Sequence, residues 1–151
     1  MPSSALAFET FDHLWRELRE LWRERPDAEV PDPADPLAGL MLRWGAHEIA
    51  LRWVVGRERM AELVGVMHND VATLPRDALE VLLELNFLAS ADGACVALEP
   101  QTRAVLLLVR RPVDGLSASD LSLLVSSMVA LMEQWGRDGG FLHAVRHGHR
   151  I

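Results

Sequence analysis

The stretch 74–135 constrains the fold of this chain most, because its hydrophobic spacing changes from that of a helix to that of strands and back again. Pro75 suits the first position of a helix, and the apolar spacing continues to Ala89. Few polar residues interrupt this segment. A helix that packs one face on a sheet needs only one apolar stripe. The excess predicts that a second face meets another protein surface, although a helix buried within one subunit would also explain it.

Two short apolar runs follow, and they predict strands. They cover residues 95–99 and 104–111 and flank turn residues at 100–103. The second run lacks alternating polar positions, which predicts a central strand covered on both faces. Cys95, the only cysteine of the chain, falls within the first run, where a buried thiol that acts as a small hydrophobic residue is expected.

Helices are predicted at both ends of the domain, and the first is amphipathic. From Ser4 to Arg25, large apolar side chains recur at spacings of three and four, and Pro26 ends the pattern. Near the other end, Ser117 and Asp120 are spaced like a capping box and predict the start of a helix that runs to about Trp135.

Residues 37–68 predict a three-stranded meander. Gly45-Ala46 fits a two-residue hairpin turn, and a second turn at 56–58 leads into a strand over residues 60–67. The first turn fixes a register with Trp44 opposite His47, Arg43 opposite Glu48, Leu42 opposite Ile49 and Leu40 opposite Leu51. Arg43 and Glu48 are then expected to form a cross-strand charge pair.

The predicted order is α-β-β-β-α-β-β-α. It indicates an α+β fold with a twisted, mostly antiparallel five-stranded sheet and three helices. The 151 residues suffice for one domain, which we expect to span residues 1–139, with a proline-rich acidic loop at 26–36. Residues 140–151 form a basic, histidine-rich tail that is expected to be loosely held.

Composition narrows the function classes. The net charge of −7 argues against nucleic-acid binding, which depends on clustered Lys and Arg. No apolar run suggests membrane insertion, and the N-terminus lacks a secretory signal pattern. With a single cysteine, a reducing, cytoplasmic setting is expected.

Signatures of catalysis or of a bound cofactor are missing from the sequence, which contains no glycine-rich phosphate loop and no nucleophile elbow. The tail histidines His143, His147 and His149 are the one candidate metal cluster. The glycines around them argue against an ordered site, so neither a metal nor a cofactor is expected.

A longer pattern joins these segments: a proline-started helix, a turn with glycine, a short strand, a long apolar strand and a long last helix. The positions that carry it are Pro75, Ala78-Leu79-Glu80, Leu82-Leu83, Asn86, Gly93, 95–98, 105–109 and 121–135. This pattern resembles the class I type III secretion chaperones of the Tir-chaperone type. The resemblance is in residue sequence from Val64 to Trp135 and in the order of elements over the whole chain.

This resemblance implies a homodimer built by the second helix and the strand that follows it. The interface residues it suggests are Leu79, Leu82, Leu83, Asn86 and Val96. It also implies a bacterial, non-enzymatic protein that binds the N-terminal region of a secreted effector and keeps that region extended.

The effector would pair with sheet edges and place apolar side chains in shallow grooves formed by the first helix and the sheet. The groove residues we expect are Phe11, Trp15, Leu18, Trp22, Trp44 and Trp53. Trp15 or Trp22 is expected to be partly exposed without a partner, although the first-helix residues could instead be the core face of that helix. Two other classes stay open: a regulatory interaction protein on the same dimeric scaffold, and a metal-binding protein or enzyme that uses the histidines.

Overall fold

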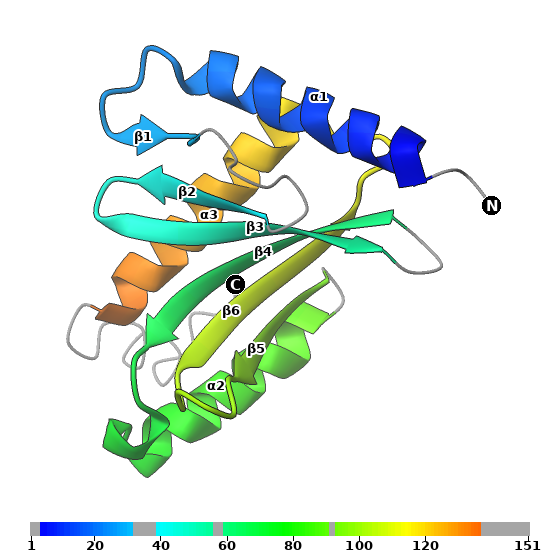
Figure 1. Cartoon of the computed structure of the whole chain (residues 1–151). Coiled ribbons are helices and arrows are strands. Elements are labelled where there is room, and N and C mark those ends of the chain that lie inside the picture. The colour runs from blue at the N-terminus through cyan, green and yellow to red at the C-terminus, as the bar shows by residue number, and fades with distance from the viewer. Residues whose placement is uncertain (1–3, 32–38, 56–58, 91–92, 137–151) are drawn as a thin grey trace.

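The computed structural model describes residues 4–31, 39–55, 59–90 and 93–136. These residues form three α-helices and six strands (Figure 1). The helices are α1 (Ser4–Trp22), α2 (Arg76–Ala89) and α3 (Ala118–Gly136). The strands are β1 (Ala28–Glu29), β2 (Leu40–Trp44), β3 (His47–Val55), β4 (Arg59–His68), β5 (Ala94–Leu98) and β6 (Val105–Pro112), and a short 3-10 helix η1 (Val71–Thr73) precedes α2.

The strands form a single sheet in the order β1-β2-β3-β4-β6-β5, and every neighbouring pair is antiparallel. The predicted α+β class, antiparallel sheet and three helices are therefore confirmed. The predicted number of strands is wrong, because β1 adds a sixth at the sheet edge. This two-residue strand lies in the stretch 26–36 that the proline content suggested was entirely loop. Ala28 and Glu29 pair with Trp44 and Arg43 of β2, while Val30 is buried just beyond them.

The hairpin between β2 and β3 turns at Gly45, as the sequence predicts. Gly45 has a φ of +60°, a conformation that glycine adopts at little cost, and the observed register is the predicted one. The expected charge pair differs, however. The Arg43 guanidinium bonds the Glu29 carboxylate of β1 at 2.9 Å, although Glu48 lies opposite Arg43 across the hairpin.

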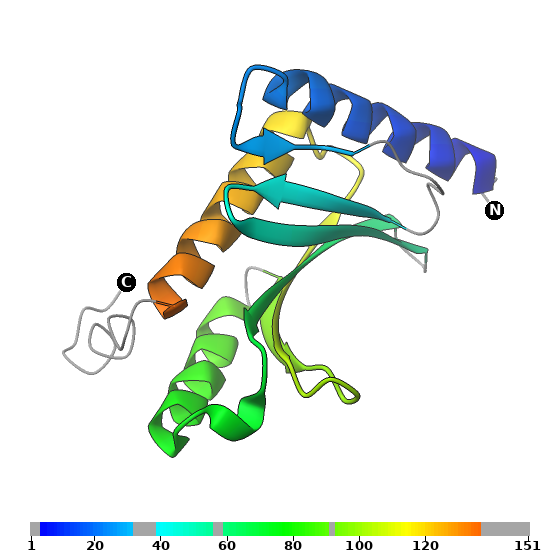
Figure 2. The same cartoon turned by 60° about the vertical axis from the view of Figure 1, so that its left-hand side comes forward.

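The core lies on one face of the sheet. Figure 1 shows α3 and α2 behind the strands and α1 across one end, and the turned view in Figure 2 shows α3 and α2 on the same side of the sheet. The largest fully buried side chains come from α1, the sheet and α3, and they are Leu18, Leu42, Ile49, Leu51, Leu63, Leu121 and Val125. Gly65 of β4 lets α3 pack closely, since a Cβ there would lie 2.7 Å from the Met132 sulfur. The other face of the sheet is covered by none of the described helices.

The helix ends follow local rules with one difference from expectation. α1 ends at Trp22, three residues before the predicted end, and the Arg25 amide closes a turn on the Trp22 carbonyl at 2.9 Å. The capping box of α3 is confirmed: the Asp120 amide donates to the Ser117 hydroxyl, and the Ser117 amide donates to the Asp120 carboxylate, both at 3.1 Å.

Strand β6 corrects a second expectation. It lies between β4 and β5 and is covered on one face only. Leu107 and Val109 are buried in the core, whereas Leu106 and Leu108 on the opposite face are half-buried. The unbroken apolar run predicted that both faces of this strand are buried. In the described part of the chain, helices cover only one face of the sheet.

Candidate interaction surfaces

Helix α2 divides its apolar residues between the core and the solvent. Ala78, Val81 and Leu82 are buried, whereas the side chains of Leu83 and Phe87 are 70% and 82% exposed. The predicted excess of apolar surface on this helix is therefore present. Large apolar side chains exposed to this degree on neighbouring turns mark a contact surface. We call Leu83 and Phe87 the α2 ridge.

The residues predicted for a dimer interface differ in exposure, so they do not all lie on one surface. Leu79 is half-buried, Leu83 is exposed, and Leu82 lies at 5% exposure within the core of its own chain. Leu82 is therefore a core residue that supports the α2 surface from beneath. Phe87, one helical turn beyond Leu83, was missed by the sequence reasoning. Its spacing of four from Leu83 is the signal that could have identified it.

Asn86 and Val96 are the remaining two residues predicted for the dimer interface, and a hydrogen bond joins them. The Asn86 side-chain oxygen accepts a 2.8 Å hydrogen bond from the Val96 amide. Strand β5 forms one edge of the sheet, and in its antiparallel ladder the amides of Ala94, Val96 and Leu98 point away from β6. Asn86 thus satisfies one donor of this edge and leaves the others open to a partner.

The predicted groove residues of α1 belong to the core instead. Phe11, Trp15, Leu18 and Trp22 are between 0% and 6% exposed, so the expectation that Trp15 or Trp22 is partly exposed is wrong. Burial follows from the packing of α1 on α3 and on the sheet. The Trp22 indole donates a 2.8 Å hydrogen bond to Ser122 of α3.

The other two predicted groove residues lie closer to the surface. Trp44 and Trp53 are half-buried, each in an edge-to-face contact with a ring of α1: Phe11 with Trp53 at 4.9 Å and Trp22 with Trp44 at 5.1 Å between ring centroids. The Arg25 guanidinium also lies 4.4 Å from the centre of the Trp44 ring. The accessible part of this region is therefore the rim made by Trp44 and Trp53.

The uncovered side of the sheet forms a further surface, which we call the open face. The strand register places on it Glu29, Met41, Arg43, Glu48, Ala50, Arg52, Val54, Met60, Glu62, Val64, Val66, Cys95, Ala97, Leu106, Leu108, Arg110 and Pro112. Met41 and Val66 are 50% and 45% exposed. Cys95 is also exposed, which corrects the expected buried thiol, because edge strand β5 directs it away from the helices. No signal in the sequence alone distinguished this side of β5 from the covered side.

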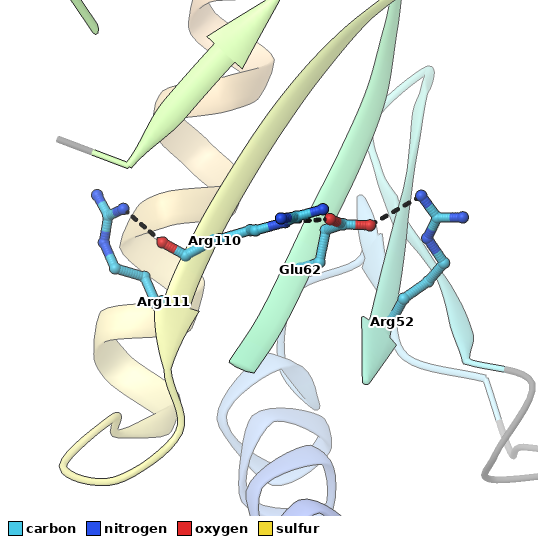
Figure 3. Close-up of polar contacts among 4 residues, drawn as sticks. All are labelled: Arg52, Glu62, Arg110 and Arg111. Carbon is cyan, nitrogen blue, oxygen red and sulfur yellow. Dashed lines mark hydrogen bonds and ion pairs between the residues drawn. The ribbon is translucent and has the colours of Figure 1, made fainter. Parts of the chain in front are cut away.

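Three charged side chains cross the centre of the open face in a line (Figure 3). The Glu62 carboxylate is 5% exposed and accepts from Arg52 Nη2 at 2.8 Å with one oxygen and from Arg110 Nε at 2.5 Å with the other. The hydrogen bond and the charge of Glu62 raise the pKa of Arg110. Both arginine side chains remain more than half exposed.

Metal and membrane sites find no support in the described part of the chain. Within those residues, no group of three or more His, Cys, Asp or Glu side chains could hold a metal ion. The candidate tail histidines lie outside the described residues. None of the described helices combines the length and apolar character needed to cross a membrane.

Comparisons with known proteins agree with this architecture. Residues 53–136 match the model of the Tir chaperone protein (CesT) family. No curated protein sequence matches the chain.

Solved structures show the same fold at low sequence identity. A chain of the HopA1-SchA chaperone-effector complex superposes with a TM-score of 0.60 at 13% identity, with 86% of this chain and 95% of that chain covered. The Yersinia pestis type III secretion chaperone SycH in complex with a stable fragment of YscM2 gives 0.62 at 13% identity, with 83% and 98% covered. The ExsC-ExsE complex gives 0.60 at 12% identity, with 85% and 94% covered.

Proposed function

Since the chain belongs to the Tir chaperone protein (CesT) family, we propose that it is a type III secretion chaperone that binds the N-terminal segment of a secreted effector and keeps that segment extended for export. The observation that carries this proposal is the family match over residues 53–136, which runs from the end of β3 through α3. The similar folds include a chaperone-effector complex, HopA1-SchA, and a secretion chaperone, SycH.

The function is binding without a catalytic step. An extended segment has unpaired backbone groups and can add as a strand to a sheet edge. Its apolar side chains can then bind in grooves on the surface beside that edge. At the end of the sheet away from α2 and β5, β1 is the outermost strand and offers an edge for such pairing. The rim of Trp44 and Trp53 offers aromatic surface for anchoring, with the buried rings of α1 beneath it.

The working unit in this proposal is a homodimer joined through α2 and β5. A twofold contact would bury the α2 ridge of each copy against the other. Leu79 lies one helical turn before this ridge, Asn86 holds β5 against α2 through the Val96 amide, and Leu82 supports the helix from the core. The Val96 side chain packs toward the core of its own chain. The site of action is the bacterial cytoplasm, because an effector segment must be bound before it is exported.

Affinity purification from the native secreting bacterium tests the proposal. A tagged copy of the chain is recovered under secretion-inducing conditions, and bound proteins are identified by mass spectrometry. We expect one or two secreted proteins whose retention is lost when their N-terminal regions are deleted. Deletion of their C-terminal regions is the matched control and should leave retention unchanged. Recovery of the chain by itself, or with a cytoplasmic regulator only, would contradict effector binding and favour a regulatory protein on the same scaffold.

A further inference from the structure

The open face carries more apolar surface than a solvated sheet face requires. β6 has leucines on both faces, and the outward ones, Leu106 and Leu108, lie beside Val66 and Val64 of β4 in the strand register. Strands of this composition are typically covered on both sides. The described helices all pack on the other face, so a cover for this one has to come from elsewhere.

The charges at the centre of this surface restrict what that cover can be. Arg52 and Arg110 share the single carboxylate of Glu62, which leaves the group with one net positive charge in a chain of net charge −7. Among the described residues, Glu62 is the only carboxylate that pairs with either arginine. Each guanidinium has five N–H donors, so both keep donors that face solvent.

A purely apolar cover would be unfavourable here. It would remove the exposed guanidinium groups from water and leave one positive charge uncompensated in a low-dielectric contact. A carboxylate on the covering segment would neutralise that charge. It would also accept charge-assisted hydrogen bonds from the donors that Glu62 leaves unused.

We propose that the open face docks an apolar effector segment with one acidic side chain, which binds between Arg52 and Arg110 and completes a neutral network with Glu62. The inference rests on the proposed function for the source of the segment. Two other occupants fit the charges less well. A second copy of this face would bring two positive centres together, and residues 137–151 contain three arginines and one aspartate.

A random library of 15-residue peptides displayed on phage is the probe, so the test does not depend on identifying an effector. The library is selected on the full-length wild-type protein. The best binder is then synthesised in two forms, one with its acidic residue and one with the corresponding amide. Affinities are measured by fluorescence anisotropy against wild type and four variants: Arg110→Gln, Glu62→Gln, Val66→Asp and Leu123→Asp.

The expected result has a definite sign for each variant. On wild type the acidic peptide binds about tenfold more tightly than its amide form, as a charge-assisted contact predicts. Arg110→Gln removes this preference, whereas Glu62→Gln increases it because both arginines lose their carboxylate partner. Charge repulsion and loss of apolar contact at Val66→Asp abolish binding. Leu123→Asp is the matched control, since Leu123 is 66% exposed on α3, away from the open face, and it leaves binding unchanged.

Three outcomes would overturn the inference: no selected binder, equal affinity of the acidic and amide peptides for wild type, or undiminished binding to Val66→Asp. Thermal melting of each variant verifies that it is folded. If Glu62→Gln does not fold, Arg110→Gln still decides the question, because Arg52 remains paired with Glu62 in that variant. If the peptide test fails but affinity purification recovers effectors from cells, the open-face site is rejected and the proposed function is kept. If the peptide test succeeds but no effector is recovered, the acidic-peptide site is kept and an effector is rejected as the source of its ligand.

Discussion

The indole nitrogen of Trp22 donates a 2.8 Å hydrogen bond to the Ser122 hydroxyl, which joins α1 to α3 across 100 residues of sequence. Trp22 is 2% exposed, so its N–H has no access to water and depends on this partner. The contact fixes the position of α1 on α3 of its own chain. It also explains why the aromatic residues of α1 are unavailable as surface anchors.

Replacement of Ser122 by alanine should destabilise the protein, because it leaves the buried indole donor unpaired. We expect a loss of about 2 kcal/mol in the free energy of unfolding, measured by urea denaturation. In a Trp22→Phe background, which has no indole N–H, the same Ser122→Ala change should cost much less. Ser127→Ala is the control, since the Ser127 hydroxyl bonds the Leu123 carbonyl of its own helix. Equal costs in the two backgrounds would contradict a role for the hydrogen bond.

The proposed dimer makes a prediction about the α2 ridge. Leu83→Asp should convert a dimer to a monomer, because it places a charge where two apolar surfaces meet. Sedimentation velocity measures the change. Leu123→Asp is the control, as Leu123 is exposed to a similar degree, 66% against 70%, but lies on α3. A Leu83→Asp protein that still sediments as a dimer would place the interface elsewhere.

The bond between Asn86 and Val96 can be tested by hydrogen exchange. Asn86→Ala removes the acceptor of the Val96 amide, so that amide should exchange about fivefold faster, which corresponds to about 1 kcal/mol. The amides of Cys95 and Ala97 provide an internal control, because the ladder directs them to β6. Unchanged exchange at Val96 would show that a neighbouring chain, and not Asn86, protects this edge.

Local rules made much of the fold predictable. The Gly45 turn fixed the β2–β3 register, and the Ser117–Asp120 pair located the start of α3 within one residue. Both signals depend on residues that are adjacent or nearly adjacent in sequence. The two-residue strand β1 was not predictable in this way, since its pairing depends on β2 and not on its own composition.

The surfaces were harder to predict than the elements. Periodicity identified Trp15 and Trp22 as part of an apolar stripe, but it could not show that α3 would cover the whole stripe. In the same way, the apolar run of β6 indicated two covered faces, although the described structure supplies one. Burial depends on which elements pack together, and a pattern within one element does not contain that information.

The capping box of α3 predicts a pH-dependent contribution to stability. Hydrogen bonds from the Ser117 hydroxyl and amide lower the pKa of Asp120 from its ordinary value of 3.8. The folded state therefore holds a proton on this group less readily than the unfolded state does. The stabilisation is fully present above the unfolded pKa and is lost as the pH falls through the lowered folded pKa.

Asp120→Asn should accordingly lower the melting temperature by a few degrees at neutral pH, because the amide is a weaker acceptor than the carboxylate and carries no charge at the helix start. The difference from wild type should shrink as the pH falls below 3.8 and through the lowered folded-state pKa, where the folded wild-type carboxyl becomes protonated. Melting curves recorded by circular dichroism across this range measure it. Glu24→Gln, which changes an exposed carboxylate outside the helices, controls for the loss of one charge. A difference that persists unchanged at low pH would assign the effect of Asp120 to side-chain packing and not to its charge.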